Sequence, residues 1–374
     1  MKYIDILRFT MLTLILTSCG RTDNNPVFYG KTIMVDYPKQ INVLTDGRIV
    51  ELEGEYTGLM NAYDGILMFT SYKHSDGLAY LYDVETGKRI RAILRMGQGP
   101  DEVIDFMFND NFEKDSNGLY LRVSAINNKF LIRINMQGEF VEKTYTARFK
   151  TTNEYGIGQF FMLNDSSLIA YMQGYTIFED GAECVAPSYR IFNYKTGEII
   201  RDYKFYSDYT AGSSESAVLL IFPEYYLSML SKIKPDKSKL AMAMSHLKRL
   251  NILDIESDKV KSIETQDSPP LNFISLGKPV HRYYEDLFCD DDYIFVVEST
   301  TTERTEANAW YWYETLTRPS GRILVYDWDG NFVCILQVKE DVSENFAFDP
   351  VRRILYTKTD DETVRAYGLN FLYK

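Results

Sequence analysis

The chain has 374 residues, enough to bury a large core, and its 41 basic and 53 acidic residues give a formal net charge of −12. An acidic surface repels phosphate backbones, so this balance argues against nucleic acid as a partner. The 29 tyrosines and 22 phenylalanines favour β-strands and adhesive surfaces.

The N-terminus has the features of an export signal. A weakly basic start leads into the apolar run 9–16, which is far too short to span a bilayer and is typical of a signal-peptide core. Leu16-Thr17-Ser18-Cys19 follows and resembles the bacterial lipobox, in which the cysteine receives the lipid. We therefore predict that residues 1–18 are removed and that Cys19 is lipidated, with residues 19–26 as a polar tether. The alternative is an ordinary secretory signal with a chance cysteine.

This signal predicts a protein held by lipid in the bacterial cell envelope, since acyl chains contribute about 0.8 kcal/mol per buried CH₂. The outer membrane is the expected site, and its periplasmic and surface faces both stay open. No other apolar run approaches the roughly 20 residues of a membrane-spanning helix.

A β-hairpin phrase recurs along the rest of the chain. Each copy has an alternating run of branched and aromatic residues, a polar turn that starts with Asp or Asn, and a second β-rich run. Five complete copies and a truncated sixth are found at Leu78–Leu94, Lys129–Tyr145, Ser188–Phe205, Leu247–Glu264, Gly321–Val338 and from Thr363 onward. The turns close on Gly87, Gly138, Gly197, Asp258 and Gly330, which lie 51 to 72 residues apart.

Two further strand-like runs precede each copy after the first. Four antiparallel strands per unit make the blade of a β-propeller, and six copies predict six blades. We therefore predict an all-β fold, in which residues 27–374 form a single six-bladed β-propeller. The last copy lacks a fourth strand, and Thr32–Asp36 is a strand without a unit of its own. We expect this N-terminal strand to complete the last blade and close the ring.

The repeat of roughly 60 residues exceeds the ~40–45 of a compact WD40 blade, so the excess must lie in loops. Three long insertions stand out: Gly174–Pro187, Ser207–Tyr226 and Ser299–Ser320. Loops of successive blades gather on the two faces of the ring, where function is expected.

The phrase Gly97-Gln98-Gly99-Pro100-Asp101-Glu102 follows the first hairpin copy. It resembles a phrase between blades in the TolB-like six-bladed propeller lipoproteins of Bacteroidetes, with Asp101 where Gly is usual. Residues 233–240 and 346–350 resemble its inner-strand turns, and Asp258 replaces a turn glycine. The resemblance covers about residues 27–374 and implies an envelope lipoprotein, in a group that is mostly uncharacterised. The acidic run that surface-exposed members often carry after the cysteine is reduced here to Asp23.

Possible sites for ions have simpler interpretations. The glycines of residues 97–100 could cradle an anion, but a turn between blades is the preferred interpretation. Residues 327–331 start like a calcium loop but lack the acidic residue at position twelve, so a hairpin turn is preferred. Asp290-Asp291-Asp292 is interpreted as a solvated turn between strands. The three histidines, His74, His246 and His281, lack metal-ligand spacing, although blades can converge in space. We expect no metal and no cofactor.

Trp310-Tyr311-Trp312-Tyr313, in the longest insertion, is the candidate binding stretch. Aromatic faces stack on sugar rings or anchor a protein partner, and the alternative is that these residues pack the loop or pair as strands. Cys184, Cys289 and Cys334 remain after Cys19, and whether two of them form a disulfide stays open.

The sequence favours a non-catalytic binding or scaffold module, monomeric, that contacts an envelope protein or a glycan. No catalytic motif was found, so no catalytic residue is assigned. The alternative is an envelope enzyme acting on glycans, a lyase or hydrolase with carboxylates at the central channel. The fold by itself favours neither function.

Overall fold

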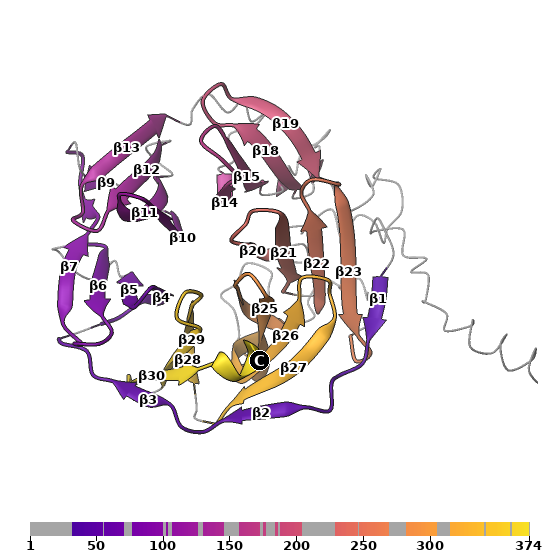
Figure 1. Ribbon diagram of the computed structural model, residues 1–374. Helices are drawn as coiled ribbons and strands as arrows, with labels where there is room; N and C mark the ends of the chain where they lie inside the picture. The colour runs from indigo at the N-terminus through magenta and orange to yellow at the C-terminus, as the bar shows by residue number, and fades with distance from the viewer. Residues whose placement is uncertain are drawn as a thin grey trace, which may run out of the picture.

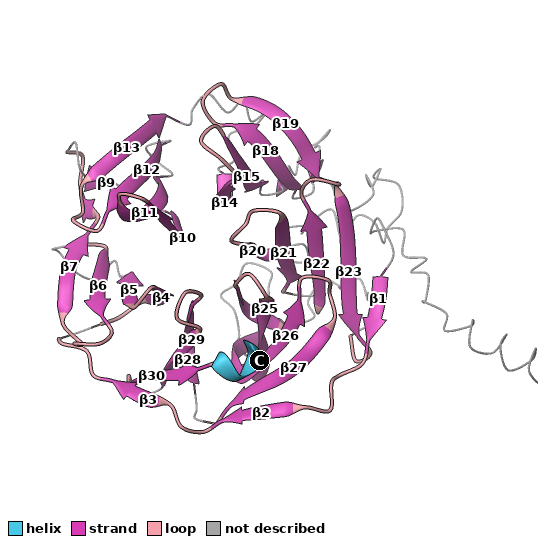
Figure 2. Ribbon diagram, in the orientation of Figure 1, coloured by secondary structure: helices cyan, strands magenta, loops and turns pink. Residues whose placement is uncertain are grey.

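The computed structural model describes residues 32–54, 56–70, 77–99, 102–103, 107–125, 130–145, 157–172, 175–176, 184–185, 188–203, 229–245, 247–268, 282–304, 315–339, 342–359 and 361–373. The regular secondary structure of these residues is almost entirely β-strand, with one short 3₁₀ helix, η1 (Asn370–Tyr373), near the C-terminus (Figure 2). Six mainly antiparallel sheets stand around a common axis, which confirms the predicted six-bladed β-propeller (Figure 1).

The first three blades follow one another along the chain, each running from the axis outward. Blade 1 consists of β4 (Leu59–Tyr63), β5 (Ile66–Thr70), β6 (Ala79–Asp83) and β7 (Arg89–Ile93). Blade 2 consists of β10 (Met107–Asp115), β11 (Gly118–Ala125), β12 (Phe130–Asn135) and β13 (Phe140–Tyr145). Blade 3 consists of β14 (Ile157–Met162), β15 (Ser167–Met172), β18 (Ser188–Asn193) and β19 (Glu198–Tyr203).

The other three blades take strands from both ends of the chain. Blade 4 consists of β20 (Met229–Ile233), β21 (Lys239–Met244), β22 (Arg249–Asp254), β23 (Lys259–Thr265) and β1 (Thr32–Val35). Blade 5 consists of β24 (Tyr284–Cys289), β25 (Tyr293–Arg304), β26 (Thr315–Asp327), β27 (Phe332–Val338) and β2 (Ile41–Leu44). Blade 6 consists of β28 (Val342–Asp349), β29 (Ile354–Thr359), β30 (Val364–Gly368) and β3 (Arg48–Val50).

The N-terminal segment 32–50, which we call the strap, runs along the outer edges of three blades (Figure 1). β1 pairs in parallel with β23, β2 pairs in parallel with β27, and β3 pairs antiparallel with β30. An N-terminal strand does close the ring, but the prediction that Thr32–Asp36 completes the last blade was wrong. β3 fills that place, because only there does the strap meet a blade with three strands of its own.

The repeated hairpin turns were predicted correctly, and their chemistry is visible. The carboxylate or amide oxygen of Asp83, Asn135, Asn193, Asp254 and Asp327 accepts backbone N–H groups of the turn that it starts. The closing positions all have positive φ, including the non-glycine Asp258 at 61°. Such a φ suits glycine and is tolerated by Asp or Asn, which explains the repeated pattern.

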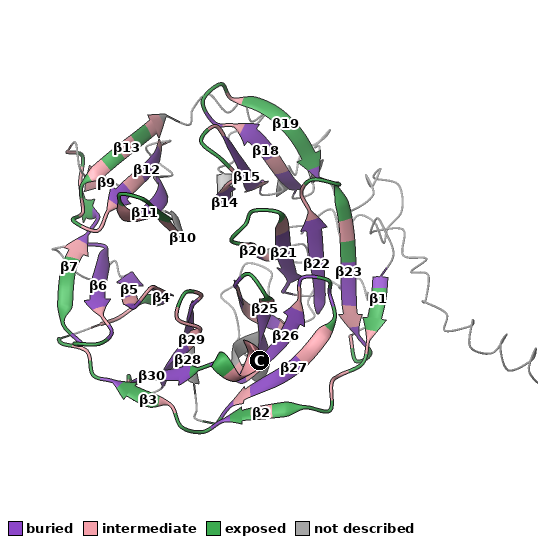
Figure 3. Cartoon of the chain, viewed as in Figure 1, coloured by how far each residue is buried: buried purple, intermediate pink, exposed green. Residues whose placement is uncertain are grey.

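The hydrophobic core lies between the blades. The described residues contain six clusters of buried side chains, each joining two neighbouring blades around the ring. Figure 3 shows the middle strands buried and the outermost strands exposed. Each fully buried Leu, Val or Phe contributes roughly 1.5–3 kcal/mol, so the ring is stabilised at its six seams rather than at its axis.

Other predictions are refined in detail. The insertion Ser299–Ser320 extends blade 5 as a long hairpin, since β25 reaches Arg304 and β26 begins at Thr315. The insertion at Gly174–Pro187 contains the short paired strands β16 (Tyr175–Thr176) and β17 (Cys184–Val185). Cys289 and Cys334 are free thiols. Within the described part of the chain, no helix is long and apolar enough to cross a membrane.

Candidate functional site

A cavity of about 1090 Å³ opens where the first turns of the six blades converge. We call it the central funnel. Its wall takes residues from the inner strand or first turn of every blade, β4, β10, β14, β20, β24 and β28 among them. Because strands alternate in direction, these first turns lie at one end of the ring, and the connections between second and third strands lie at the other.

The turns at the funnel rim are held by short polar side chains. Asp115, Asn164, Asp236, Asp290 and Asp349 each use one side-chain oxygen to accept backbone N–H groups two or three residues further on. This local bond fixes each turn without help from other blades. The rim is therefore a set of rigid turns that present the neighbouring side chains to the cavity.

Ionisable side chains dominate the wall, in unusual balance for an acidic protein. Among the residues that line the funnel, seven are basic and six are acidic: Lys114, Arg122, Arg133, Lys195, Lys232, Lys237 and Arg353 against Glu113, Asp115, Glu142, Asp165, Asp290 and Asp291. Blade 2 supplies three of the carboxylates together with Lys114, Arg122 and Arg133, whereas blade 4 supplies lysines and no carboxylate. The funnel thus offers charges of both signs on blade 2 and positive charge on blade 4.

A buried arginine organises the blade 2 side. The Arg122 side chain is only 6% exposed, and it donates to Glu113 Oε1 at 2.6 Å and to Glu142 Oε2 at 3.3 Å. Burial lowers its pKa, but the two glutamates outweigh this effect and raise the pKa of Arg122 above its ordinary value. Arg133 pairs with Asp115 at 2.6 Å and stacks 3.7 Å over the Tyr120 ring. These ion pairs hold three carboxylates in fixed positions on one wall.

Aromatic side chains add apolar surface beside the charges. The rings of Tyr63 and Phe112 are stacked, with centroids 5.5 Å apart at 24°, across the boundary between blades 1 and 2. Both are half-buried and line the funnel. Beside them, the fully buried Asp349 accepts the Gly65 N–H at 2.7 Å and ties blade 6 to blade 1 at the closing seam.

The acidic run 290–292 is the turn between β24 and β25, but it is not fully solvated as predicted. Asp290 is 4% exposed, and burial raises the pKa of its carboxyl above the usual range. Its Oδ2 accepts the hydroxyl of Tyr373, and its backbone oxygen accepts the Trp328 indole N–H at 2.9 Å. Asp290 therefore anchors η1 against blade 5, while Asp291 faces the funnel.

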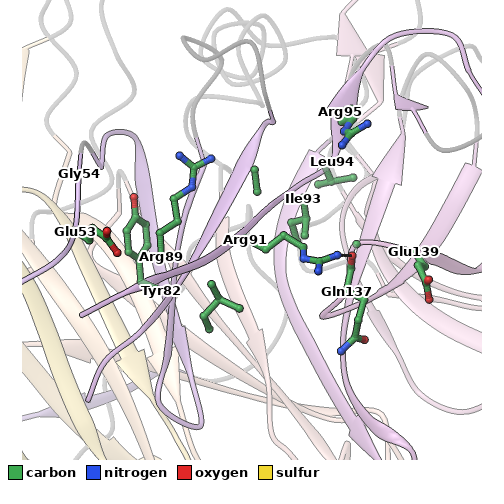
Figure 4. Close-up of a pocket in the computed structure, with 13 residues that line it drawn as sticks. Glu53, Gly54, Tyr82, Arg89, Arg91, Ile93, Leu94, Arg95, Gln137 and Glu139 are labelled. Atoms are coloured by element: carbon green, nitrogen blue, oxygen red, sulfur yellow. Dashed lines mark hydrogen bonds between the residues drawn. The ribbon is translucent and has the colours of Figure 1, made fainter. Parts of the chain in front are cut away.

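A second cavity of about 840 Å³ lies on the outside of the ring, and we call it the β7 groove. Residues 89–95 form its floor, Glu53 and Gly54 border one side, and residues 137–139 of blade 2 border the other. Figure 4 shows Arg89 and Arg91 projecting from strand β7, with the Arg91 guanidinium donating to the backbone oxygen of Gln137.

The site residues predicted from the sequence are not among the described residues. Trp310, Tyr311, Trp312 and Tyr313 fall outside the described residues, as does Cys19 and as do all three histidines. The ends of β25 and β26 that flank residues 305–314 point to the face opposite the funnel, since the turn 290–292 starts β25 at the other end. Among the residues that the structure describes, no group of three His, Cys, Asp or Glu side chains is placed to hold a metal ion.

The preferred interpretations of the glycine-rich phrase and of residues 327–331 as turns are confirmed. Gly99 donates its N–H to Glu102 Oε2 at 2.9 Å, so the chain's own carboxylate takes the place that an anion would occupy. Asp327 accepts N–H groups from Asp329 and Asn331 within its own turn.

Sequence reasoning missed the funnel residues, Arg122 and the stacked pair Tyr63–Phe112 above all. One signal was available, because charged residues end the inner strand of blade 2 at Glu113-Lys114-Asp115. Inner strands line the axis of a propeller, so charges there point to a polar channel.

Comparison with known proteins supports the fold. No sequence profile of a known protein family matches the chain, and no curated protein matches it. Among solved structures, a DUF4221 family member from Bacteroides vulgatus ATCC 8482 is 15% identical with a TM-score of 0.50, over 89% of this chain and 96% of that one.

Two further structures are more distant. A Bacteroides fragilis NCTC 9343 protein described as exported is 13% identical with a TM-score of 0.49, over 86% of this chain and 89% of that one. The Cps50 (Swd1) β-propeller domain of Myceliophteria thermophila is 12% identical with a TM-score of 0.41, over 87% and 100%. At such identities the likeness concerns the fold: the chain is a six-bladed β-propeller similar in fold to a propeller protein of Bacteroides.

Proposed function

We propose that the protein is a non-catalytic binding module of the bacterial cell envelope whose central funnel binds a glycan. One observation carries this proposal: all six blades contribute to one cavity of about 1090 Å³ that combines ionisable and aromatic side chains. Ligand sites in proteins have volumes of about 300–1,000 Å³ and place a few polar groups against apolar surface.

A sugar ring matches this lining better than a wholly apolar ligand does. Its hydroxyl groups both donate and accept hydrogen bonds, and the wall offers carboxylates on blade 2 and lysines on blade 4. Its apolar face can lie on an aromatic ring, and the half-buried pair Tyr63–Phe112 supplies one beside the charges. The ion pairs of Arg122 hold Glu113 and Glu142 in place before the ligand arrives.

The anchor belongs to the same proposal. The lipobox of residues 16–19 would hold the propeller to the membrane through lipidated Cys19, by way of the tether up to residue 26. Trp310, Tyr311, Trp312 and Tyr313 remain proposed contacts to an envelope protein or glycan. The funnel would then bind a ligand while this aromatic run meets a partner.

A glycan-processing enzyme is a second candidate, because Glu113, Asp115 and Glu142 share one wall of the funnel. A lyase or hydrolase needs one carboxyl group that can donate a proton. Here Arg122 forms ion pairs with both glutamates, and the hydrogen bond from Arg133 holds the pKa of the Asp115 carboxyl below its usual range. This arrangement fits binding better than acid catalysis.

The experiment uses the mature chain with Cys19→Ser, which removes the lipid, on a panel of bacterial and host glycans, followed by calorimetry with each ligand found. Lys237→Gln and Asp165→Asn alter exposed funnel residues and should weaken binding about tenfold, as expected for loss of a charge-assisted hydrogen bond. Lys259→Gln, on the exposed outer strand β23, is the control and should bind normally.

The outcomes separate the candidates. A glycan that binds unchanged in mass and responds to both funnel variants supports the proposal. A glycan that is cleaved over time, with loss of cleavage in Glu142→Gln, would establish the enzyme instead. A glycan that binds Lys237→Gln and Asp165→Asn as tightly as it binds the parent would exclude the funnel as its binding site.

A further inference from the structure

The outer edges of the six blades are not alike. In blades 4 and 5 the strap adds β1 and β2 to the outermost strands, and in blade 6 it supplies the outermost strand. In the described residues of blade 1, the sheet order ends at β7, with no strand on its outer side. An open strand edge offers backbone donors and acceptors that another extended segment can use.

The chain itself shows how such an edge is occupied. β1 lies parallel to β23 over four residue pairs, from Thr32–Ser262 to Val35–Thr265, and β2 lies parallel to β27 over four more. Outer strands of this propeller therefore accept a short parallel strand from a segment distant in sequence. β7 holds the equivalent position in blade 1.

The edge of β7 also lies in a cavity. The β7 groove follows the strand from residue 89 to residue 95 and has a volume of about 840 Å³. Its borders, Glu53 with Gly54 and the turn 137–139, stand apart on either side of the strand (Figure 4). A five-residue strand such as β7 spans about 17 Å, the length of a short extended peptide.

The charge of this edge sets it apart from the other open edges. Residues 87–95 contain Lys88, Arg89, Arg91 and Arg95 and no acidic residue, in a chain with a net charge of −12. All four are exposed. The outer strands of blades 2 and 3, β13 and β19, mix both signs of charge. Arg89 is set over the Tyr80 ring at 4.2 Å, which orders its guanidinium.

We infer that the β7 groove is a docking site for an extended acidic segment of a partner protein. The segment pairs with the outer edge of β7 as a fifth strand of blade 1, and its carboxylates meet Arg89, Arg91 and Arg95. Arg91 donates one N–H to the backbone oxygen of Gln137 and has further N–H donors for a ligand, because a guanidinium carries five of them. An anionic lipid headgroup would use the charges but not the strand edge, so a peptide fits the observations better.

The test uses the mature chain with Cys19→Ser and a fluorescent seven-residue peptide of alternating glutamate and valine, capped at both ends, read by anisotropy. The peptide should bind, and Arg91→Ser with Arg95→Ser should weaken binding about tenfold. Lys143→Ser, an exposed cation on the open strand β13, is the matched control and should leave binding unchanged. Backbone amides of residues 89–93 should exchange more slowly with solvent when the peptide is bound.

A second peptide isolates strand pairing from charge. N-methylation at alternate residues keeps every carboxylate but removes backbone donors, so it should also cost about tenfold in affinity. Equal binding of the methylated peptide would overturn the inference, because charge alone would then explain it. The inference would also be overturned if the protein bound phosphatidylglycerol vesicles but not the peptide, and if the arginine changes abolished the vesicle binding. A folded Arg95→Ser variant that binds the peptide as tightly as the parent would contradict it as well.

Discussion

The guanidinium of Arg249 in β22 donates to the hydroxyl oxygen of Thr32 in β1 at 2.8 Å, across 217 residues of sequence. Arg249 is 1% exposed and also donates to Glu264 at 3.1 Å. The strap is therefore held on blade 4 by a buried charged group as well as by parallel strand pairing. A buried ion pair adds little to stability by itself, but breaking one is costly, which makes this contact easy to test.

Arg249→Met should lower the free energy of unfolding by about 3 kcal/mol, because the buried ion pair with Glu264 and the hydrogen bond to Thr32 are both lost. Thr32→Val keeps the shape and removes one acceptor, so we expect about 1 kcal/mol. Urea unfolding followed by tryptophan fluorescence measures both. Thr45→Val, at an exposed threonine of the same strap, is the control, and an equal loss there would refute the specific role of Thr32.

Closure of the ring depends on β3 rather than on β1. Val50 is 2% exposed in the seam between blades 6 and 1, whereas its neighbour Ile49 is 51% exposed. Val50→Asp should therefore cost several kcal/mol, since it buries an unpaired charge, and Ile49→Asp should cost less than about 1 kcal/mol. Thermal unfolding of the two variants provides the comparison. Similar melting temperatures would contradict closure by β3.

Asp258 occupies a turn position that glycine fills in the other hairpins. Its φ of 61° is strained for a side chain, but its carboxylate pairs with Arg201 at 2.7 Å and accepts the Tyr203 hydroxyl at 2.8 Å, joining blades 3 and 4. Asp258→Ala keeps the strain and loses the contacts, so we expect a loss of about 1–2 kcal/mol. Asp258→Gly loses the contacts but relieves the strain, and its stability should lie close to that of the parent. A glycine variant less stable than the alanine variant in chemical denaturation would exclude this balance.

The pH dependence of stability should reveal the funnel turn at Asp236. Burial raises the pKa of this carboxyl, but hydrogen bonds from Lys234 and Ser238 outweigh it and lower the pKa from 3.8 to about 2. A carboxyl whose pKa is lower in the folded state than in the unfolded state stabilises the protein at pH values above its unfolded-state pKa. This stabilisation is lost as the pH falls through the folded-state pKa. The difference in unfolding free energy between the parent and Asp236→Asn should thus be constant above about pH 5 and shrink between about pH 4 and pH 2. Scanning calorimetry of both proteins at several pH values measures this difference. A difference that stays constant down to pH 2 would disprove the lowered pKa of Asp236.

The blades could be predicted because their signals are local. Each hairpin is marked by an Asp or Asn that accepts turn N–H groups and by a residue with positive φ three or four positions further on, and both are visible in the sequence. The strap could not be predicted in the same way. β2 and β3 are only four and three residues long, and their partners β27 and β30 lie some 300 residues away. Thr32–Asp36 was recognised as a strand but assigned to the wrong blade, since pairing between edges leaves no local pattern.

The funnel was beyond sequence reasoning for a related reason. Tyr63 and Phe112 stack only because blades 1 and 2 place their inner strands side by side. Arg122 joins Glu113 to Glu142 across three strands of one blade, and nothing in their spacing marks that contact. The aromatic run 310–313 was conspicuous in sequence because it is contiguous, whereas the funnel is assembled from short pieces of all six blades.

The central claim is that the ligand enters the funnel, and amide hydrogen exchange tests it most directly. The mature Cys19→Ser chain would be compared with and without a saturating glycan found on the panel. We expect slower exchange in the rim turns when the glycan is bound, above all at residues 115–118, 163–167 and 290–293. Slower exchange confined to residues 299–304 and 315–320, which flank the aromatic run 310–313, would place the ligand on the opposite face and contradict it.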